Sequence, residues 1–367
     1  MIVLNVFFIF VLSLGFNYSK VIMQIAKQTW NTNKILLFIT LLSTLGCSFP
    51  LQVTRTIPTE TPTSQPTLTP TQAPLATPEL GSDQNPLILA LAPSSHPTEA
   101  LISAGDMLAA YLEARTGYRV VTVVPASEAA LIEALKKGNA HIASLSPYGF
   151  VFAREQETVT ALLARVRQGE MLYGAQIIIN REGEFTAYFD EERGENTTDA
   201  VTALKQFTDK KPCWSDAVSP SGYVVPLGLL NQAQVTTRAG AFLEGQPNVV
   251  RGVYADDICD FGGTFIDARA SPTLEADYPD VMGRVRVAWR TANIIPYENI
   301  SVSLSLPFDA RRNIQRAFID FMSTPEGKAA MQTIYGFDEM LPVEDAAYAE
   351  FIALVKASGL GLSDLIK

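Results

Sequence analysis

The sequence predicts an α/β fold with two domains, and three observations lead to that prediction. The chain has 367 residues, 47% of them apolar, which is enough to bury a sizeable core and to form two domains. From residue 86, short apolar runs alternate with segments of helical periodicity, and this β-α-β-α-β order favours a parallel sheet covered by helices. A second α/β set follows between residues 212 and 289.

The first set contains five expected elements. The run "PLILALAP" is apolar and ends at a turn, as a buried strand does. In the helix after it, Leu101, Leu108 and Leu112 fall on one face, Pro97 suits the first turn, and Gly117 suits the end. The expected order is strand 86–93, helix 97–117, strand 118–125, helix 127–138 and strand 141–146.

The later elements are expected as follows. The run "GAQIIIN" (174–180) predicts a strand, whereas the polar, Gly- and Glu-rich segment 182–202 predicts a loop. A helix is expected to start near Ser221, because Pro226 would break a helix interior and must lie early. The last elements are strand 284–289, helix 309–324 with Asp309 as N-cap, and helix 325–336 with Thr324 as N-cap.

The charged and reactive residues exclude several classes of function. The net charge is −10, from 38 acidic and 28 basic residues, which argues against a nucleic-acid binder. The chain has two histidines and three cysteines, and their spacing predicts neither a metal site nor a cofactor. It also lacks a G-x-S-x-G motif and a credible Ser-His-Asp set, so we expect no enzyme activity.

Residues 1–46 are predicted to be a signal peptide. The apolar run "ILLFITLLSTLGC" follows Lys27 and Lys34 and ends in Cys47, the layout of a secretory signal. The end of this run resembles a bacterial lipobox, although Thr44 and Leu45 depart from its pattern, and the resemblance implies that Cys47 is lipidated. Residues 1–22 then precede an alternative start at Met23. The alternative is a membrane anchor, but the run is shorter than the roughly 20 residues that a span needs.

Residues 47–85 are predicted to be a linker. Proline recurs at every fourth position from Pro58 to Pro78, with nine threonines between Thr54 and Thr77. Such a stretch has too little apolar surface to fold, and its prolines favour an extended spacer between the membrane and the folded part.

Hydroxyl side chains gather at three junctions where a strand is followed by a helix. The junctions hold Ser94, Ser95 and Thr98, then Ser144 and Ser146, then Ser219, Ser221 and Gly222. Ligands of open α/β sheets collect at the carboxyl ends of strands, and the start of a helix attracts anions through its free N–H groups. Serine also caps helices without binding any ligand, so one junction alone would indicate little.

These motifs together resemble the substrate-binding proteins of ABC importers for phosphate, phosphite and phosphonate, over residues 86–355. The segments that carry the resemblance include "SPSGYVVP" (219–226), which is similar to a Ser-Thr-Ser-Gly turn of the family that grips phosphonate oxygens. The others begin "YLEARTG" (111–153), "VYADDICDFGG" (253–263) and "NIIPYEN" (293–331).

The resemblance implies a two-lobed, type II periplasmic-binding-protein fold, with a ligand cleft between two hinged α/β domains. Lobe 1 would comprise residues 86–172 and 291–367, and lobe 2 residues 173–290. Two crossover strands would form the hinge and allow the lobes to close on the ligand.

The resemblance also implies a set of ligand-binding residues. They are Ser95, His96, Ser146, Tyr148, Ser219, Ser221, Gly222, Tyr223 and Asp260. The hydroxyls and nearby amides would grip the oxyanion, one tyrosine would cover the substituent on phosphorus, and Asp260 would face the ligand. Alternatively, Asp260 is simply solvated and His96 is an ordinary loop residue.

The chain departs from the family pattern at three points. Pro220 replaces a threonine of the gripping turn. His141, expected to be structural, stands in place of an aspartate. A histidine that the family often carries has no counterpart, and Gln246 is the nearest polar residue.

The two cysteines of lobe 2 are predicted to form a disulfide. Disulfides persist outside the cytoplasm, and with Cys47 lipidated Cys213 and Cys259 remain as a pair. The bond would brace the wall of the cleft, and the alternative is two buried free thiols.

The predicted function is therefore that of a monomeric solute-binding lipoprotein, exported and lipid-anchored at the outer face of the cell membrane. It would deliver a phosphonate, phosphite or phosphate ligand to an ABC permease. The alternatives are a binding protein that presents its ligand to a signalling partner, and a binder of another small anion.

Overall fold

The computed structural model describes residues 78–366, which belong to one compact unit that begins at Leu75. The predicted signal peptide, Cys47 and most of the linker lie outside the described residues. No helix within this described part combines the length and the apolar character needed to cross a membrane.

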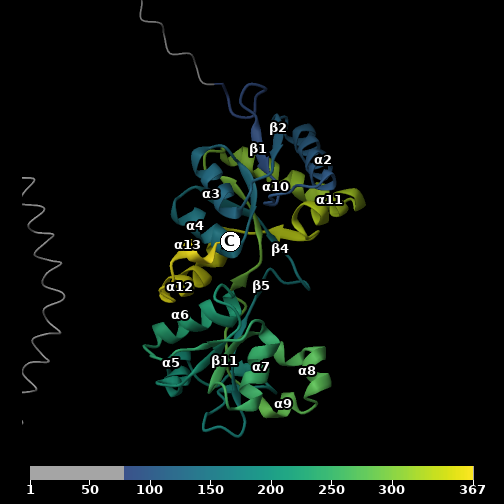
Figure 1. Ribbon diagram of the computed structural model, residues 1–367. Helices are drawn as coiled ribbons and strands as arrows, with labels where there is room; N and C mark the ends of the chain where they lie inside the picture. Colours follow the sequence, from purple (N-terminus) through teal and green to yellow (C-terminus); the bar gives the residue numbers. More distant parts are fainter. Residues whose placement is uncertain (1–77, 367) are drawn as a thin grey trace, which may run out of the picture. The chain divides into compact units, whose positions relative to one another are not determined.

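A six-stranded sheet lies in the upper part of Figure 1, with the strand order β15-β4-β14-β3-β1-β2. Its strands are β1 Leu87–Ala90, β2 Val120–Val123, β3 Ile142–Leu145, β4 Val159–Arg165, β14 Asn299–Ser303 and β15 Met340–Pro342. Strands β2, β1 and β3 are parallel, as predicted, but β14 runs antiparallel to both β3 and β4. The sheet is therefore mixed, because β14, which comes late in the chain, lies between β3 and β4 and runs in the opposite direction.

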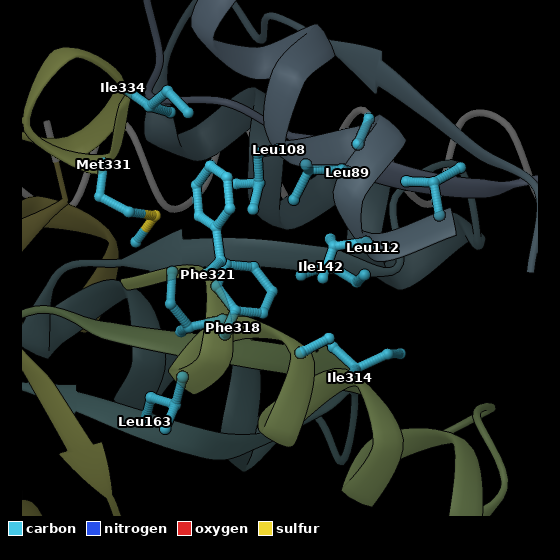
Figure 2. Close-up of a cluster of buried hydrophobic side chains, with 14 of the residues drawn as sticks. Leu89, Leu108, Leu112, Ile142, Leu163, Ile314, Phe318, Phe321, Met331 and Ile334 are labelled. Carbon is cyan, nitrogen blue, oxygen red and sulfur yellow. The ribbon is translucent and has the colours of Figure 1, made fainter. Parts of the chain in front are cut away.

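Helices cover both faces of the six-stranded sheet. The side chains of Leu87, Leu89 and Leu91 point to one face and that of Ala90 to the other, as the period of a strand requires. The first face packs against α2 Glu99–Thr116, α10 Phe308–Met322 and α11 Pro325–Tyr335, whose buried residues include Leu108, Phe318 and Met331 (Figure 2). The second face packs against α3 Glu128–Lys137 and α4 Pro147–Glu155.

Several helix ends follow the predicted capping chemistry, and two do not. Thr324 accepts a hydrogen bond from the Gly327 N–H at the start of α11, and Gly117 ends α2 in the left-handed region, at φ 75°. Asp309, however, lies in the first turn of α10 and does not cap it, because that helix begins one residue earlier. Pro97 lies before the N-cap of α2, which is Thr98, so it is not in the first turn.

A five-stranded sheet forms the other half of the described chain, with the order β10-β9-β11-β6-β12. Its strands are β6 Ala175–Asn180, β9 Pro212–Trp214, β10 Ala241–Phe242, β11 Phe261–Phe265 and β12 Val285–Arg290. The helices beside it are α5 Ala200–Leu204, α6 Val225–Gln232, α7 Gln246–Ala255, α8 Pro272–Asp277 and α9 Val281–Arg284. The segment predicted as a loop (182–202) also contains the short strands β7 Phe189–Asp190 and β8 Glu195–Asn196, which pair with each other, and the start of α5.

Two segments connect the sheets, and they pair with each other. Strand β5 (Leu172–Tyr173) precedes β6, strand β13 (Ile295–Pro296) follows β12, and the two are antiparallel. The C-terminal helices are α12 Ala349–Ala357 and α13 Leu362–Leu365. Helix α12 packs so tightly on α6 that a Cβ on Gly228 would lie 2.2 Å from the Leu354 carbonyl oxygen.

The predicted disulfide between Cys213 and Cys259 is confirmed. Cys213 lies in β9, and Cys259 lies two residues before β11, the strand that pairs with β9. Both cysteines are buried in the cluster of apolar side chains between this sheet and α7. The bond therefore links the two parallel strands from which the site described below is built.

His141 is a structural residue, as predicted. Its side chain is 4% exposed, and its Nδ1 accepts a hydrogen bond of 3.0 Å from the Ile88 N–H at the start of β1. Nδ1 can accept only when it carries no proton, so this contact requires the neutral imidazole. Burial also lowers the pKa of His141, which favours the same form.

We predict that His141 makes the fold less stable in acid. Because the pKa of His141 is lower in the folded chain, the unfolded chain takes up a proton that the folded chain refuses once the pH falls below about 6.5. The free energy of unfolding should therefore decrease between pH 7.5 and 5.5, and by less in His141→Asn, whose Oδ1 accepts from Ile88 but does not titrate. Urea unfolding at both pH values measures this, and equal losses in the two proteins would contradict it.

Candidate functional site

The turn between β9 and α6 brings three serines together. Ser215 follows the last residue of β9, and Ser219 is the N-cap of a π-helical turn, Pro220–Val224, that continues into α6. The helical segment thus begins at Pro220, one residue before Ser221, near which its start was predicted. Its first amides are also not free, since Gly222 N–H donates to Ser219 Oγ at 3.1 Å and Tyr223 N–H to the Ser219 carbonyl at 3.1 Å.

The amide of Gln246 lies at the centre of these serines. Its Nε2 lies 3.1 Å from Ser219 Oγ and 3.4 Å from the Oγ atoms of Ser215 and Ser221. Gln246 is the first residue of α7, so this one side chain connects the starts of two helices. We call Ser215, Ser219, Ser221 and Gln246 the hydroxyl cluster.

The contacts of Gln246 orient the serine hydroxyls. Its Oε1 accepts a hydrogen bond of 3.1 Å from the Phe265 N–H, and because a backbone N–H can only donate, the NH₂ group must face the serines. The Oγ of Ser219 accepts from both Gln246 and Gly222, which occupies its two lone pairs. Its own proton is therefore left to donate elsewhere, and an oxyanion is a suitable acceptor.

Gly222 permits this arrangement because it has no side chain. A Cβ at this position would lie 2.0 Å from Ser215 Oγ and 2.8 Å from Gln246 Nε2. Gly222 was predicted to offer a free amide N–H to the ligand. In the structure its lack of a side chain instead allows the π-helical turn to approach Ser215.

Two of the predicted tyrosines occupy different environments. Tyr223 is half-buried, with its ring 5.5 Å from that of Trp214 and 5.0 Å from that of Phe242. Tyr148 is 5% exposed and its ring packs on Phe351, while its buried hydroxyl, near Tyr173, has no hydrogen-bond partner among the described residues. Burial raises the pKa of Tyr148, and the nearby Tyr173 hydroxyl adds to this effect.

Tyr173 was not predicted, yet it lies against the hydroxyl cluster. It belongs to β5, one of the two segments that connect the sheets, and its ring stacks on Tyr297. Burial raises the pKa of Tyr173, and the nearby Ser221 hydroxyl opposes that shift. The cluster is thus linked to the connection between the sheets.

Ser146 lies at the carboxyl end of β3, and its donors are already occupied. Its N–H donates to Glu128 Oε1 at 2.7 Å and its hydroxyl to Glu128 Oε2 at 2.8 Å. The sequence predicts that these groups donate to a ligand, but in the structure they donate to the Glu128 carboxylate. The sequence gives no signal for this contact, because an acid at the start of a helix is common.

The structure places Ser95 and His96 in an exposed loop between β1 and α2. Ser95 Oγ and His96 Nδ1 lie 3.0 Å apart, and His96 N–H donates to Ser94 Oγ at 3.2 Å. These contacts are local and fix the loop, and they do not bring either residue to the hydroxyl cluster.

The structure does not bring Asp260 to the hydroxyl cluster either. Asp260 precedes β11, where its carboxylate accepts from Lys211 N–H at 2.6 Å and pairs with Arg238 at 2.7 Å. Strand β11 runs parallel to β9, so Asp260 lies beside Lys211, while Ser215 lies four residues further along, about 13 Å away. The direction of β11 thus places Asp260 away from the hydroxyl cluster.

The acid at the same end of β11 as the cluster is Asp267. Its carboxylate accepts from Gln176 at 2.8 Å and pairs with Arg290 at 2.9 Å and with the buried Arg269 at 2.7 Å. Burial favours the neutral acid, but the hydrogen bonds and charge of Arg269 outweigh it, so the pKa of Asp267 lies below its usual range. Within residues 78–366, no group of three or more acids, histidines and cysteines is placed to hold a metal ion.

The hydroxyl cluster lies at the carboxyl ends of β9 and β11, where the ligands of α/β sheets collect. The model of the family described as "ABC transporter, phosphonate, periplasmic substrate-binding protein" matches residues 90–348, and the chain belongs to this family. Its proteins bind substrates for transporters outside the cytoplasm and are not enzymes.

Individual relatives are distant. The chain is 25% identical over 216 residues to the phosphate-import protein PhnD of Mycolicibacterium smegmatis, a match that spans 56% of this chain and 62% of the relative. Two structures of XAC2383 from Xanthomonas citri, bound to ATP and to chloride, are each 14% identical, with TM-scores of 0.52 and 0.51. They cover 76% and 74% of this chain and 99% and 97% of theirs. The fold is accordingly the two-lobed periplasmic-binding-protein fold that the sequence predicts.

We predict that Gly222→Ala destabilises the protein by about 1–3 kcal/mol, because the new methyl group must displace Ser215 or the π-helical turn. Gly283→Ala, in α9, is the matched control: its Cβ would meet no atom within 4 Å, and we expect a change within about 0.5 kcal/mol. Urea unfolding measures both, and a Gly222→Ala protein as stable as the control would contradict the packing described.

Proposed function

We propose that the protein binds a phosphorus oxyanion at the hydroxyl cluster and delivers it to an ABC permease. The observation that carries this proposal is the convergence of three serine hydroxyls on one Gln246 amide, which donates to Ser219 and so leaves the Ser219 proton to donate to a ligand. A tetrahedral oxyanion needs several such donors at once, and uncharged N–H and O–H donors bind it through hydrogen bonds of defined geometry.

In this proposal the two sheets belong to lobes that close on the ligand. Lobe 1 comprises residues 86–172 and 291–367, lobe 2 comprises residues 173–290, and β5 and β13 connect them. Tyr173, a residue of the connection, lies near the Ser221 hydroxyl, and this proximity supports a link between ligand binding and closure of the lobes.

The ligand is proposed to be phosphonate, phosphite or phosphate, in keeping with the family. The relative from Mycolicibacterium smegmatis is named as a phosphate-import protein, which favours the same class. A protein that presents its ligand to a signalling partner would use the same cluster. If no phosphorus oxyanion binds, we expect the ligand to be a different small anion.

We predict that Ser219→Ala and Ser221→Ala each weaken methylphosphonate binding by about 1 kcal/mol or more, roughly fivefold, since each removes one donor. Asp260→Asn should leave the affinity unchanged, because Asp260 lies at the other end of its strand. Isothermal titration calorimetry measures all three. Unchanged affinity in both serine variants would place the ligand elsewhere.

We predict that Gln246→Glu weakens binding more strongly, by about tenfold or more. The new carboxylate would still accept a hydrogen bond from the Phe265 N–H, but it cannot donate to the serines. It would instead accept hydrogen bonds from their hydroxyls, which are then not available to the ligand, and its charge would repel the oxyanion. Gln232→Glu makes the same change at an exposed position near the end of α6 and is the matched control. Equal affinities of the two variants would contradict the role of Gln246.

The protein is further proposed to be a monomer held at the outer face of the cell membrane through lipidated Cys47. We predict that the full chain, expressed in a bacterium, enters the detergent phase of a phase-partition assay, and that Cys47→Ser enters the aqueous phase. Ser48→Ala, one residue away, should behave as the wild type. If Cys47→Ser still entered the detergent phase, another anchor would be responsible.

A further inference from the structure

A polar cavity of about 440 Å³ lies at the carboxyl ends of β1, β2 and β3 in the six-stranded sheet. Its polar lining consists of Ser127, Glu128, Ser144, Ser146, Glu298 and Tyr335. Two carboxylates and no basic side chain therefore face this space. This is an unusual lining for the wall of a site proposed to receive an anion.

Glu128 occupies the position at the start of α4 that an external anion would take. Its two oxygens accept the N–H and the hydroxyl of Ser146, the N-cap of α4, at 2.7 and 2.8 Å. A Cβ on Gly149 would lie 2.3 Å from Glu128 Oε1, so only glycine leaves room for the carboxylate. The carboxylate is thus closely fitted to this helix start.

The second carboxylate reinforces the negative charge of the cavity. That second carboxylate belongs to Glu298, and an ion pair of 2.8 Å with Arg165 offsets part of its charge, so Glu128 supplies most of the negative charge that faces the cavity. Burial and the charge of Glu298 raise the pKa of Glu128, while its hydrogen bonds to Ser146 oppose this effect. An incoming anion would have to displace Glu128 or lie beside its carboxylate.

We propose that Glu128 is a specificity-determining residue, which fills the anion site at the start of α4 and rejects ligands that carry a second negative charge beyond the oxyanion. This inference rests on the proposed function, in which the oxyanion lies at the hydroxyl cluster. The remainder of the ligand then faces the cavity of lobe 1, where a further carboxylate meets Glu128 and Glu298.

The test compares methylphosphonate with phosphonoacetate, which carries an added carboxylate, by calorimetry on the wild type and on Glu128→Gln. The wild type should bind methylphosphonate at least about tenfold more tightly than phosphonoacetate. Glu128→Gln keeps the shape of the side chain and loses its charge, so the affinities for methylphosphonate and phosphonoacetate should then differ by no more than about threefold. Glu133→Gln, on the exposed side of the same helix, should keep the wild-type ratio.

Each outcome has a defined meaning. If neither protein binds methylphosphonate, the proposed function fails. If methylphosphonate binds but the ratio is the same in the wild type and in Glu128→Gln, Glu128 sets no charge preference and this inference fails. Thermal unfolding verifies that Glu128→Gln is folded, and Glu128→Asp, which keeps the charge, should retain a preference for methylphosphonate of at least about tenfold; loss of that preference would also overturn the inference.

Discussion

The contact of the Gln246 amide with three serine hydroxyls is the interaction on which the site depends. Without it, Ser215, Ser219 and Ser221 would be free to donate to one another or to the backbone, and no common direction would be imposed on their protons. The amide can impose one because its oxygen is held by the Phe265 N–H, on a neighbouring strand. The five-stranded sheet, through Phe265 at the end of β11, therefore sets the orientation of the Gln246 amide.

The surrounding fold supplies the precision that this interaction needs. The starts of α6 and α7 approach each other over the ends of parallel strands β9 and β11, which the Cys213–Cys259 disulfide joins. Gly222 then allows a close approach that any side chain would prevent. On the other sheet, Ser146 lies at an equivalent strand end, but Glu128 satisfies its donors. The two halves thus contribute opposite chemistry, donors on one side and carboxylates on the other.

Most of the fold could be predicted from the sequence, because strand and helix periodicities are local. The start of the helical segment before α6 was predicted to within one residue, but its π-helical form was not, since a π-helical turn leaves little signal in the sequence. Asp260 was chosen for its place in a motif, whereas its position depends on the direction of β11, which is set by pairing with distant strands. The roles of Glu128 and Gln246 were missed for the same reason: each acts through residues 18 to 31 positions away.

A crystal structure of the protein with methylphosphonate would show which side chains bind the phosphonate group. We expect phosphonate oxygens within about 3.2 Å of the Oγ atoms of Ser219 and Ser221, with the Gln246 amide still in contact with both serines. A phosphonate bound instead at the start of α4, with Glu128 displaced and those hydroxyls untouched, would contradict the proposed binding site.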